Sequence, residues 1–446
     1  MPNITKRSPK IHFEFVPAKK QSTLGGLPAI EAMAQRFDLW KKIRALPGID
    51  PRVRTSHGYA PELLVAQLLY SLCGGGASLA DAERLNDEPL ARQLARVERF
   101  ADQTQLGEWL RQQTDRSIQA FWQLISQFIQ WVIAQADAAR WTHAGRAEVF
   151  FDDTQIEVFG PSFQGAKLNY EGNLALSWQT LWFGPFLLAG QLGSPGDVSG
   201  ALPALLKEHR AFWHDRPSDF LADSGSSSAA YLQAIAQAGF THWSVSYNKW
   251  TTVPERTAAA LPQAAWQPAT QTRWRDGTEV TEQHTGIRHT PEDSDFTFPL
   301  ATARWKKADE MFWRYAFVAH DERRTDAAAI MARHRLKGGK EQLFKEVLRG
   351  LDLHHPPCVS LTANRMFYAI AALAYNLMKA VQLLCLPDDC QAWTVPTLLK
   401  QMVRLPATLV RHARQLVARV EVAASWLDWW RLWETRWWRA AQPAAG

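Results

Sequence analysis

The chain has 446 residues, of which 46% are hydrophobic and 21% are charged, and its formal net charge is +6 at pH 7. This length can bury a large core and indicates more than one domain, and the ordinary composition excludes a chain that is disordered throughout. The positive charge is a mild excess, so composition alone does not identify a nucleic-acid-binding protein. We find no run of the ~18 apolar residues that a spanning helix needs, and we expect no membrane partner.

The cysteines show no paired spacing of the kind that zinc sites use. They are Cys73, Cys358, Cys385 and Cys390. We expect them to be reduced, structural thiols of a cytosolic protein. The first residues contain no apolar segment typical of a signal peptide.

Residues 1–140 are predicted to form an N-terminal helical domain. Apolar residues recur at steps of three and four from residue 27 to about residue 130, which is the helical period. Ser78 followed by Asp81 resembles a capping box that opens a helix. Residues 78–111 could form a helix-turn-helix unit that reads DNA, although helices packed for stability alone produce the same pattern.

The composition changes at about residue 147, where strand and helix signals begin to alternate, so we predict an α/β domain with a mixed sheet flanked by helices. A stretch rich in Thr, Gln and Pro interrupts it, and its Asp276-Gly277 pair is typical of a hairpin turn. The C-terminal segment is rich in Trp and Arg, and we predict helix over 397–439. The predicted regions are 145–250 and 307–385 for the α/β domain, 251–306 for a small β insertion, and 386–446 for the C-terminal helical segment.

Three acidic residues stand out from their surroundings. Asp152 interrupts the apolar, β-prone run 149–158, and Asp223 follows the strand signal at 220–222. Glu341 lies among basic residues. Side chains alternate along a strand, so Asp152 shares a face with Thr154, and Asp153 points to the opposite face.

Each acid has a plain structural interpretation when it is taken alone. Asp152 could cap a strand, Asp223 could begin an ordinary turn, and Glu341 could pair with a lysine four residues away on a solvated helix. Together they suggest more, because two or three carboxylates are the ligands that Mg²⁺ takes, and metal-bound carboxylate sites cleave phosphodiesters.

The chain resembles insertion-sequence transposases of the DDE class, and most closely the family numbered thirteen-eighty. The residues that carry the resemblance are spread over most of 20–385. They are Phe151-Asp152-Asp153-Thr154, Phe159-Gly160, Gln164-Gly165-Ala166, Tyr170, Ala222-Asp223-Ser224-Gly225, Lys337-Gly338-Gly339-Lys340-Glu341, Ala363-Asn364 and Leu373-Ala374-Tyr375-Asn376-Leu377, with Ser22-Thr23-Leu24-Gly25-Gly26-Leu27 and residues 75–90 nearer the N-terminus.

The resemblance implies an RNase H-like core in which Asp152, Asp223 and Glu341 are both the catalytic residues and the metal ligands. It implies Mg²⁺ as the cofactor, with Mn²⁺ able to substitute, and a β insertion between the second and third acids. The implied activity is cut-and-paste transposition of DNA that carries terminal inverted repeats, by a homodimer on the DNA. The implied location is the bacterial cytoplasm, at the nucleoid when DNA is bound.

Related transposases also place a Tyr, an Arg and Lys residues around the Glu. Here His334 stands at the Tyr position and Lys337 at the Arg position, Lys345 fills one Lys position, and Leu348 occupies the later one. Lysine keeps the charge of arginine but loses its bidentate fork. We predict that DNA phosphates are bound by Arg335, Lys337, Lys340 and Lys345.

Some alternatives remain open at the level of sequence. Trp426, Trp430, Trp433 and Trp437 fall on one helical face, which could pack in the core, form a dimer interface or, with the interleaved Arg residues, stack on bases. A stand-alone RNase H-like nuclease would use the same acids without requiring terminal repeats. A non-catalytic DNA-binding protein, derived from a decayed transposase, would bind repeats without metal-dependent cleavage.

Overall fold

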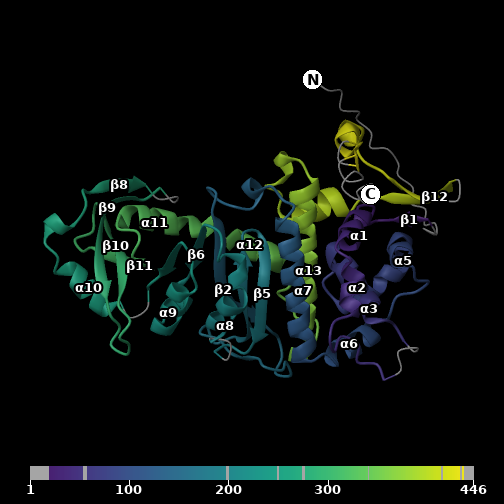
Figure 1. Ribbon diagram of the computed structural model, residues 1–446, viewed down its shortest axis with the longest axis horizontal. Coiled ribbons are helices and arrows are strands. Elements are labelled where there is room, and N and C mark those ends of the chain that lie inside the picture. The colour runs from purple at the N-terminus through teal and green to yellow at the C-terminus, as the bar shows by residue number, and fades with distance from the viewer. Residues whose placement is uncertain are drawn as a thin grey trace, which may run out of the picture.

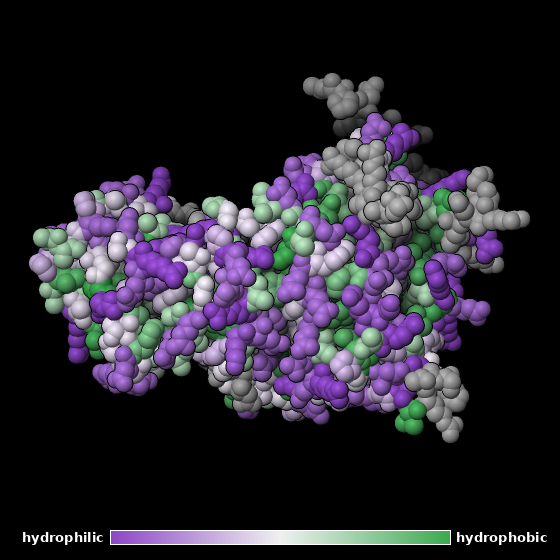
Figure 2. All heavy atoms as spheres, viewed as in Figure 1, coloured by the Kyte–Doolittle hydropathy of each residue, from purple (hydrophilic) through white to green (hydrophobic). Residues whose placement is uncertain are grey.

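A computed structural model describes residues 20–53, 58–196, 200–248, 251–273, 277–339, 341–412, 415–431 and 434–435. The basic residues before position 20 lie outside these ranges, as do Lys340, Trp433 and Trp437. Figure 1 shows an elongated molecule, with the N-terminal helices at one end, the inserted strands at the other and a mixed sheet between them. The face seen in Figure 2 is largely hydrophilic, and its hydrophobic patches are small and scattered.

The N-terminal part is helical, as its periodicity predicts. Its main helices are α1 (Leu27–Arg36), α2 (Leu39–Arg44), α3 (Pro61–Cys73), α4 (Leu79–Glu83), α5 (Pro89–Ala95), α6 (Gln103–Arg111) and α7 (Asp115–Ile133). Three of them begin with capping boxes, at Ser78, Asp102 and Thr114, which satisfy N–H groups that would otherwise lack partners.

Within the described residues, a ten-stranded sheet forms the centre of the molecule. Its strands are β2 (Ala147–Glu157), β3 (Lys167–Leu168), β4 (Leu174–Phe183), β5 (Phe186–Gly193), β6 (Ser218–Ala222), β7 (His242–Ser246), β8 (Thr270–Arg273), β9 (Glu279–His289), β10 (Phe298–Lys307) and β11 (Arg314–His320). The order is β3-β4-β2-β6-β7-β11-β10-β9-β8, and β5 also pairs with β4. β2, β6 and β7 are parallel, whereas the β2–β4 and β4–β5 pairs are antiparallel. The sheet is therefore mixed, as predicted.

Helices cover both faces of this sheet. The elements after β5 are α8 (Ala201–Glu208), the 3₁₀ turn η3 (Arg210–Phe212), α9 (Ala229–Gln237), α10 (Thr252–Ala259), α11 (Ala327–Arg335), the 3₁₀ turn η6 (Leu336–Gly339), α12 (Glu341–Gly350), α13 (Leu361–Cys385) and α14 (Val395–Leu398). On one face, Trp182 packs against Phe344 of α12 and Tyr375 of α13, with ring centroids 5.2 and 5.6 Å apart. On the other face, Phe220 stacks on Phe240, which follows α9. The sheet is thus the middle of three layers.

The inserted strands extend the main sheet rather than form a sheet of their own. β11 pairs with β7 through the register Val318↔Ser246, and β10, β9 and β8 follow in antiparallel order. β8 and β9 flank the Asp276-Gly277 dipeptide, so the predicted hairpin is present, and Gly277 has φ +85°. Gly277 suits this position because a glycine adopts positive φ without steric cost.

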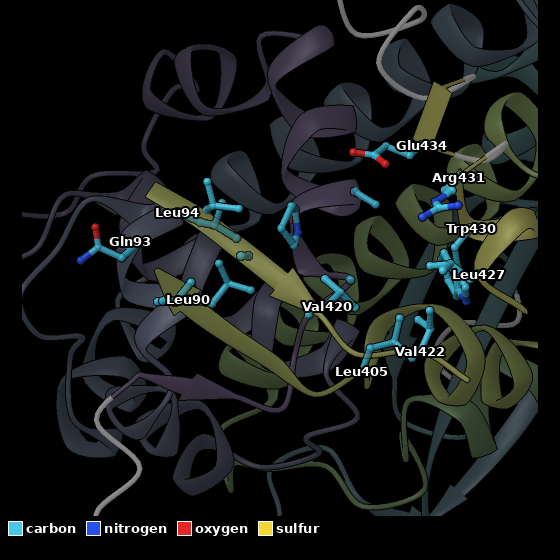
Figure 3. Close-up of a pocket in the computed structure, with 17 residues that line it drawn as sticks. Leu90, Gln93, Leu94, Leu405, Val420, Val422, Leu427, Trp430, Arg431 and Glu434 are labelled. Carbon is cyan, nitrogen blue, oxygen red and sulfur yellow. The ribbon is translucent and has the colours of Figure 1, made fainter. Parts of the chain in front are cut away.

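The C-terminal segment differs from the helix predicted over 397–439. Strands β12 (Ala407–His412) and β13 (Gln415–Val420) form a hairpin, and β12 also pairs with β1 (Gln21–Ser22). A hairpin of this kind needs its distant partner β1, which local periodicity does not reveal. Figure 3 shows a pocket of about 640 Å³ between this hairpin, α1 and α5, lined mostly by apolar side chains such as Leu90, Leu405 and Trp430.

The core helix α13 is long and apolar enough to span a membrane, but 94% of its most apolar window is buried inside the protein. This is the arrangement of a core helix. Two asparagines of the sequence motif are fully buried on it. Asn364 bonds to the N–H and C=O of Cys358, and Asn376 bonds to the N–H and C=O of Leu187 on β5. Both therefore act as structural partners of backbone groups.

Replacing Asn376 by leucine should destabilise the protein by about 3 kcal/mol. The new side chain has a similar size but leaves the N–H and C=O of Leu187 without partners, and each buried unsatisfied group costs roughly 1–3 kcal/mol. Urea unfolding at neutral pH would measure the change. Gln130→Leu, on the exposed side of α7, is the control and should change stability by no more than about 0.5 kcal/mol. Equal losses in the two variants would contradict the role of Asn376.

Candidate active site

The register between two parallel strands places Asp152 beside Asp223. The last paired residues are Phe151 of β2 and Ala222 of β6, so the two aspartates come next on neighbouring strands. Asp223 keeps an extended backbone, with φ −80° and ψ 175°, so its side chain continues the alternation of β6. Neighbouring strands lie about 4.8 Å apart, and residues at equivalent positions point to the same face. The two carboxylates therefore share one face, where the parallel ladder of β2 and β6 stops: Asp152 lies in the middle of β2, and Asp223 directly follows β6.

Asp152 is the more enclosed member of this pair. Burial raises the pKa of its carboxyl group, and the nearby charge of Asp223 raises it further. A hydrogen bond donated by the Thr154 hydroxyl, 2.8 Å from Asp152 Oδ2, and the charge of Lys337 both act in the opposite direction. An additional cation at this position would stabilise the ionised carboxylate.

Asp153 points to the opposite face of the sheet, as alternation predicts. Its Oδ1 accepts hydrogen bonds from the Ser177 hydroxyl and from the Gln155 amide. The two adjacent aspartates therefore have separate surroundings, although they are neighbours in sequence.

Helix α11 and the turn η6 bring the charge of Lys337 to the acid pair. The ammonium group of Lys337 forms an ion pair with Asp223 Oδ1, and the lysine side chain is 9% exposed whereas that of Asp223 is 56% exposed. One turn earlier, His334 lies between two hydroxyl groups. Its Nδ1 is 2.9 Å from Ser244 Oγ, and its Nε2 is 2.8 Å from Ser246 Oγ. These contacts hold the end of α11 against β7.

Helix α12 begins on the face that carries Asp152. In the antiparallel register of β2 and β4, Asp152 pairs with Thr180 and Phe150 pairs with Trp182, so Asp152 and Trp182 point to the same side. Phe344 of α12 packs on Trp182. Glu341, the first residue of α12, lies one turn before Phe344 and four residues after Lys337. Glu341 therefore lies on the covered face of the sheet between two residues that contact it, and its side chain is outside the described part of the chain.

The predicted phosphate-binding residues have different surroundings. Arg335 forms a two-pronged ion pair with Glu282 of β9, and the distance from its Nη1 to Glu282 Oε2 is 3.1 Å. Burial raises the pKa of Glu282, but hydrogen bonds from His284 and Arg335 outweigh it and bring the value to about 2. Lys345 is exposed on α12. Lys340 lies outside the described residues.

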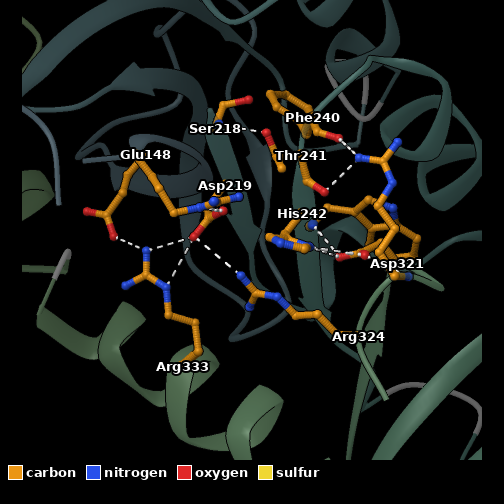
Figure 4. A network of polar contacts seen from close by, with 12 residues as sticks. Glu148, Ser218, Asp219, Phe240, Thr241, His242, Asp321, Arg324 and Arg333 are labelled. Atoms are coloured by element: carbon orange, nitrogen blue, oxygen red, sulfur yellow. Dashed lines mark hydrogen bonds and ion pairs between the residues drawn. The ribbon is translucent and has the colours of Figure 1, made fainter. Parts of the chain in front are cut away.

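Sequence reasoning missed a second group of charges on the same strands. Glu148 and Asp219 form a register pair on β2 and β6, each is only 3% exposed, and Arg333 of α11 reaches both (Figure 4). The sequence did contain a signal for these acids. Glu148 lies four residues before Asp152 and Asp219 lies four residues before Asp223, so each shares a face of its strand with that aspartate.

The carboxylate oxygens of the acid pair suit a hard divalent cation. Asp152 and Asp223 offer carboxylate oxygens side by side, and the raised pKa of Asp152 reports a carboxyl group with little water and too little positive charge near it. Among the side chains that the structure describes, no group of three or more His, Cys, Asp or Glu is placed to hold a metal.

The His334 imidazole should titrate near pH 4 in the metal-free protein rather than near 6.5. Burial, together with the charge of Lys337, lowers the pKa of His334 to about 4, although Asp223 acts in the opposite direction. Because the pKa of His334 is lower in the folded protein, the ring takes up its proton at a higher pH in the unfolded chain than in the folded one. Stability from this group is therefore complete above pH 6.5 and declines as the pH falls toward 4, by on the order of 3 kcal/mol.

An NMR titration of the ring, assigned with His334→Gln, would measure this pKa directly. His209→Gln is the matched control, since burial also lowers the pKa of His209 to about 4 at a site away from the acid pair. A His334 midpoint near 6.5 would mean that the ring is not enclosed as described.

Comparison with known protein families identifies the family of this chain. Residues 5–432 match the family model described as transposase DDE domain group 1. No curated protein matches the sequence. The match spans most of the 446 residues and includes the acid pair, α11, α12 and the C-terminal hairpin. The predicted membership of the DDE class is confirmed: the chain belongs to the DDE transposases, in group 1 of the DDE domain family.

Proposed function

We propose that this transposase cuts DNA at the terminal inverted repeats of its element and joins the freed ends to target DNA. The observation that carries the proposal is the placement of Asp152 and Asp223 side by side on one face of the sheet, where the parallel ladder of β2 and β6 stops, with Lys337 paired to Asp223. The strand order β5-β4-β2-β6-β7, with helices on both faces, supports an RNase H-like core.

Asp152, Asp223 and Glu341 are proposed to hold Mg²⁺, and Mn²⁺ should substitute because it accepts the same oxygen ligands. The bound metal would lower the pKa of an attacking water and stabilise charge on the phosphodiester oxygens. The protein residues fix where this happens. Thr154 holds the Asp152 carboxylate in place by its hydrogen bond, and the parallel ladder fixes the spacing to Asp223.

The basic residues near the site are proposed to bind the DNA backbone. Lys337 is already at the acid pair, and Lys345 is exposed on the helix that begins there. Lys340 lies between them in sequence. Arg335 should contribute least, because Glu282 already engages both ends of its guanidinium group. Contacts of this type weaken steeply with salt, since binding releases counterions from DNA.

The N-terminal helices, within residues 1–140, are proposed to bind the DNA ends. Helices α4, α5 and α6 follow one another through short connections, which is compatible with a helix-turn-helix arrangement. Two ends must meet in one reaction, so we propose that two copies of the chain act together on DNA. The proposed domain organisation also includes the β insertion, residues 251–306, and the C-terminal segment, residues 386–446.

Replacing Asp152 or Asp223 by asparagine should abolish metal-dependent cleavage and leave DNA binding intact. Loss of even an outer partner of a metal site typically costs 10–100-fold, so we expect the loss of a ligand to lower the cleavage rate by more than about a hundredfold. The substrate is a duplex that carries the inverted repeats flanking the gene, and end cleavage is followed with Mg²⁺ and with Mn²⁺.

Asp153→Asn is the matched control because its side chain lies on the opposite face, so this variant should cut at close to the normal rate. Normal cutting by Asp223→Asn would reject the assignment of the acids. Equal cutting of random duplex by the unmodified protein would favour a nuclease without repeat specificity, and repeat binding with no cutting would favour a non-catalytic DNA-binding protein.

A further inference from the structure

Two pairs of acids occupy one face of β2 and β6, one above the other along the strands. Glu148 pairs with Asp219, and four residues later Asp152 lies beside Asp223. We call Glu148 and Asp219 the inner acid pair, and Asp152 and Asp223 the outer acid pair. Residues four apart in a strand share a face and are about 13 Å apart. The two pairs differ in exposure, because both inner acids are 3% exposed whereas Asp223 reaches solvent.

Arginines neutralise the inner acid pair. Arg333 Nη2 lies 2.5 Å from Glu148 Oε1 and 3.1 Å from Asp219 Oδ2. Arg146 Nε lies 2.7 Å from Asp219 Oδ1, and Arg324 Nη2 lies 3.7 Å from Asp219 Oδ2. Figure 4 shows Arg333 reaching from its helix between the two carboxylates. Buried charges are tolerated only in such paired geometry, so these contacts fix positions closely.

Arg333 belongs to the helix that delivers the cation of the outer acid pair. Arg333 and Lys337 are four residues apart, so they lie on one face of the helical path through α11 and η6. Arg333 engages the inner acid pair, Lys337 engages the outer one, and His334 between them bonds to β7. One stretch of helix is thereby fastened to three adjacent strands.

The contact between Lys337 and Asp223 is unsuited to hold this helix by itself. Asp223 is half exposed, and in the proposed reaction its oxygens and the Lys337 ammonium are needed by metal and DNA. The contacts of Arg333 are buried and involve groups with no proposed role in the reaction. The first two turns of α12 have contacts of their own, since Phe344 packs on Trp182 and buried Glu346 lies 3.1 Å from Lys379 of α13.

We propose that Arg333 is a positioning residue: by binding both inner acids it sets where η6 and the start of α12 lie over the outer acid pair. This inference rests on the proposed function for its effect on cleavage. Arg333 itself contacts neither substrate nor the outer acids. Because misplacement of reacting groups by about 1 Å can cost a hundredfold in rate, loosening this contact should slow the reaction without weakening DNA binding.

The experiment compares Arg333→Gln with Arg146→Gln. Each variant removes one arginine from Asp219, but only Arg333 lies on α11, whereas Arg146 immediately precedes β2. Cleavage is measured with saturating DNA, DNA affinity is measured separately, and hydrogen exchange of residues 327–350 is followed without DNA. Arg333→Lys keeps the charge but loses the second donor, Nε, that also bonds to Asp219, so it tests the guanidinium fork.

We expect Arg333→Gln to lower the rate at saturating DNA at least about tenfold, with DNA affinity changed less than about threefold, and to speed exchange in residues 327–350. Arg333→Lys should fall between this variant and the unmodified protein, and Arg146→Gln should keep its rate within about threefold. Similar rates and similar exchange for Arg333→Gln and Arg146→Gln would overturn the proposal. If the unmodified protein fails to cut DNA, the proposed function fails, and the exchange comparison still decides whether Arg333 fixes the helix.

Discussion

The hydrogen-bonded register between β2 and β6 is the constraint on which the rest of the site depends. It holds Asp152 and Asp223 on adjacent strands, although like charges at this distance repel and contribute to the raised pKa of Asp152. Backbone pairing inside a three-layer core therefore offsets a local electrostatic cost. A slip of one residue would turn every side chain of a strand to the opposite face, so burial of the sheet also fixes which acids meet.

Part of the site could be predicted because its signals are local. An acid at the end of an apolar strand is visible in sequence, and the alternation of side chains along a strand is enough to separate Asp152 from Asp153. The delivery of Lys337 to the outer acid pair is not local, since it depends on contacts that α11 and η6 make with strands far away in sequence. The inner acid pair is harder to recognise, because Glu148 and Asp219 look like ordinary strand charges until their four-residue offset from Asp152 and Asp223 is considered.

The wrong predictions of the fold have a common physical origin, which is strand pairing between segments far apart in sequence. β1 and β12 are separated by almost the whole chain, and without β1 a Trp- and Arg-rich segment resembles one face of a helix. In the insertion the hairpin itself was predictable from Asp276-Gly277. Its attachment to β7 through β11 was not, because nothing near β11 in sequence indicates which strand it joins.

The ion pair between Arg335 and Glu282 has a mechanical consequence. Glu282 lies within β9, and Arg335 is the last residue of α11, directly before the turn that contains Lys337. Coupling between distant parts of a protein is carried by such contiguous contacts between rigid elements. The outlying strands are therefore joined by a direct contact to the residue that precedes the turn facing the two aspartates, so the insertion and the acid pair are two ends of one continuous set of contacts.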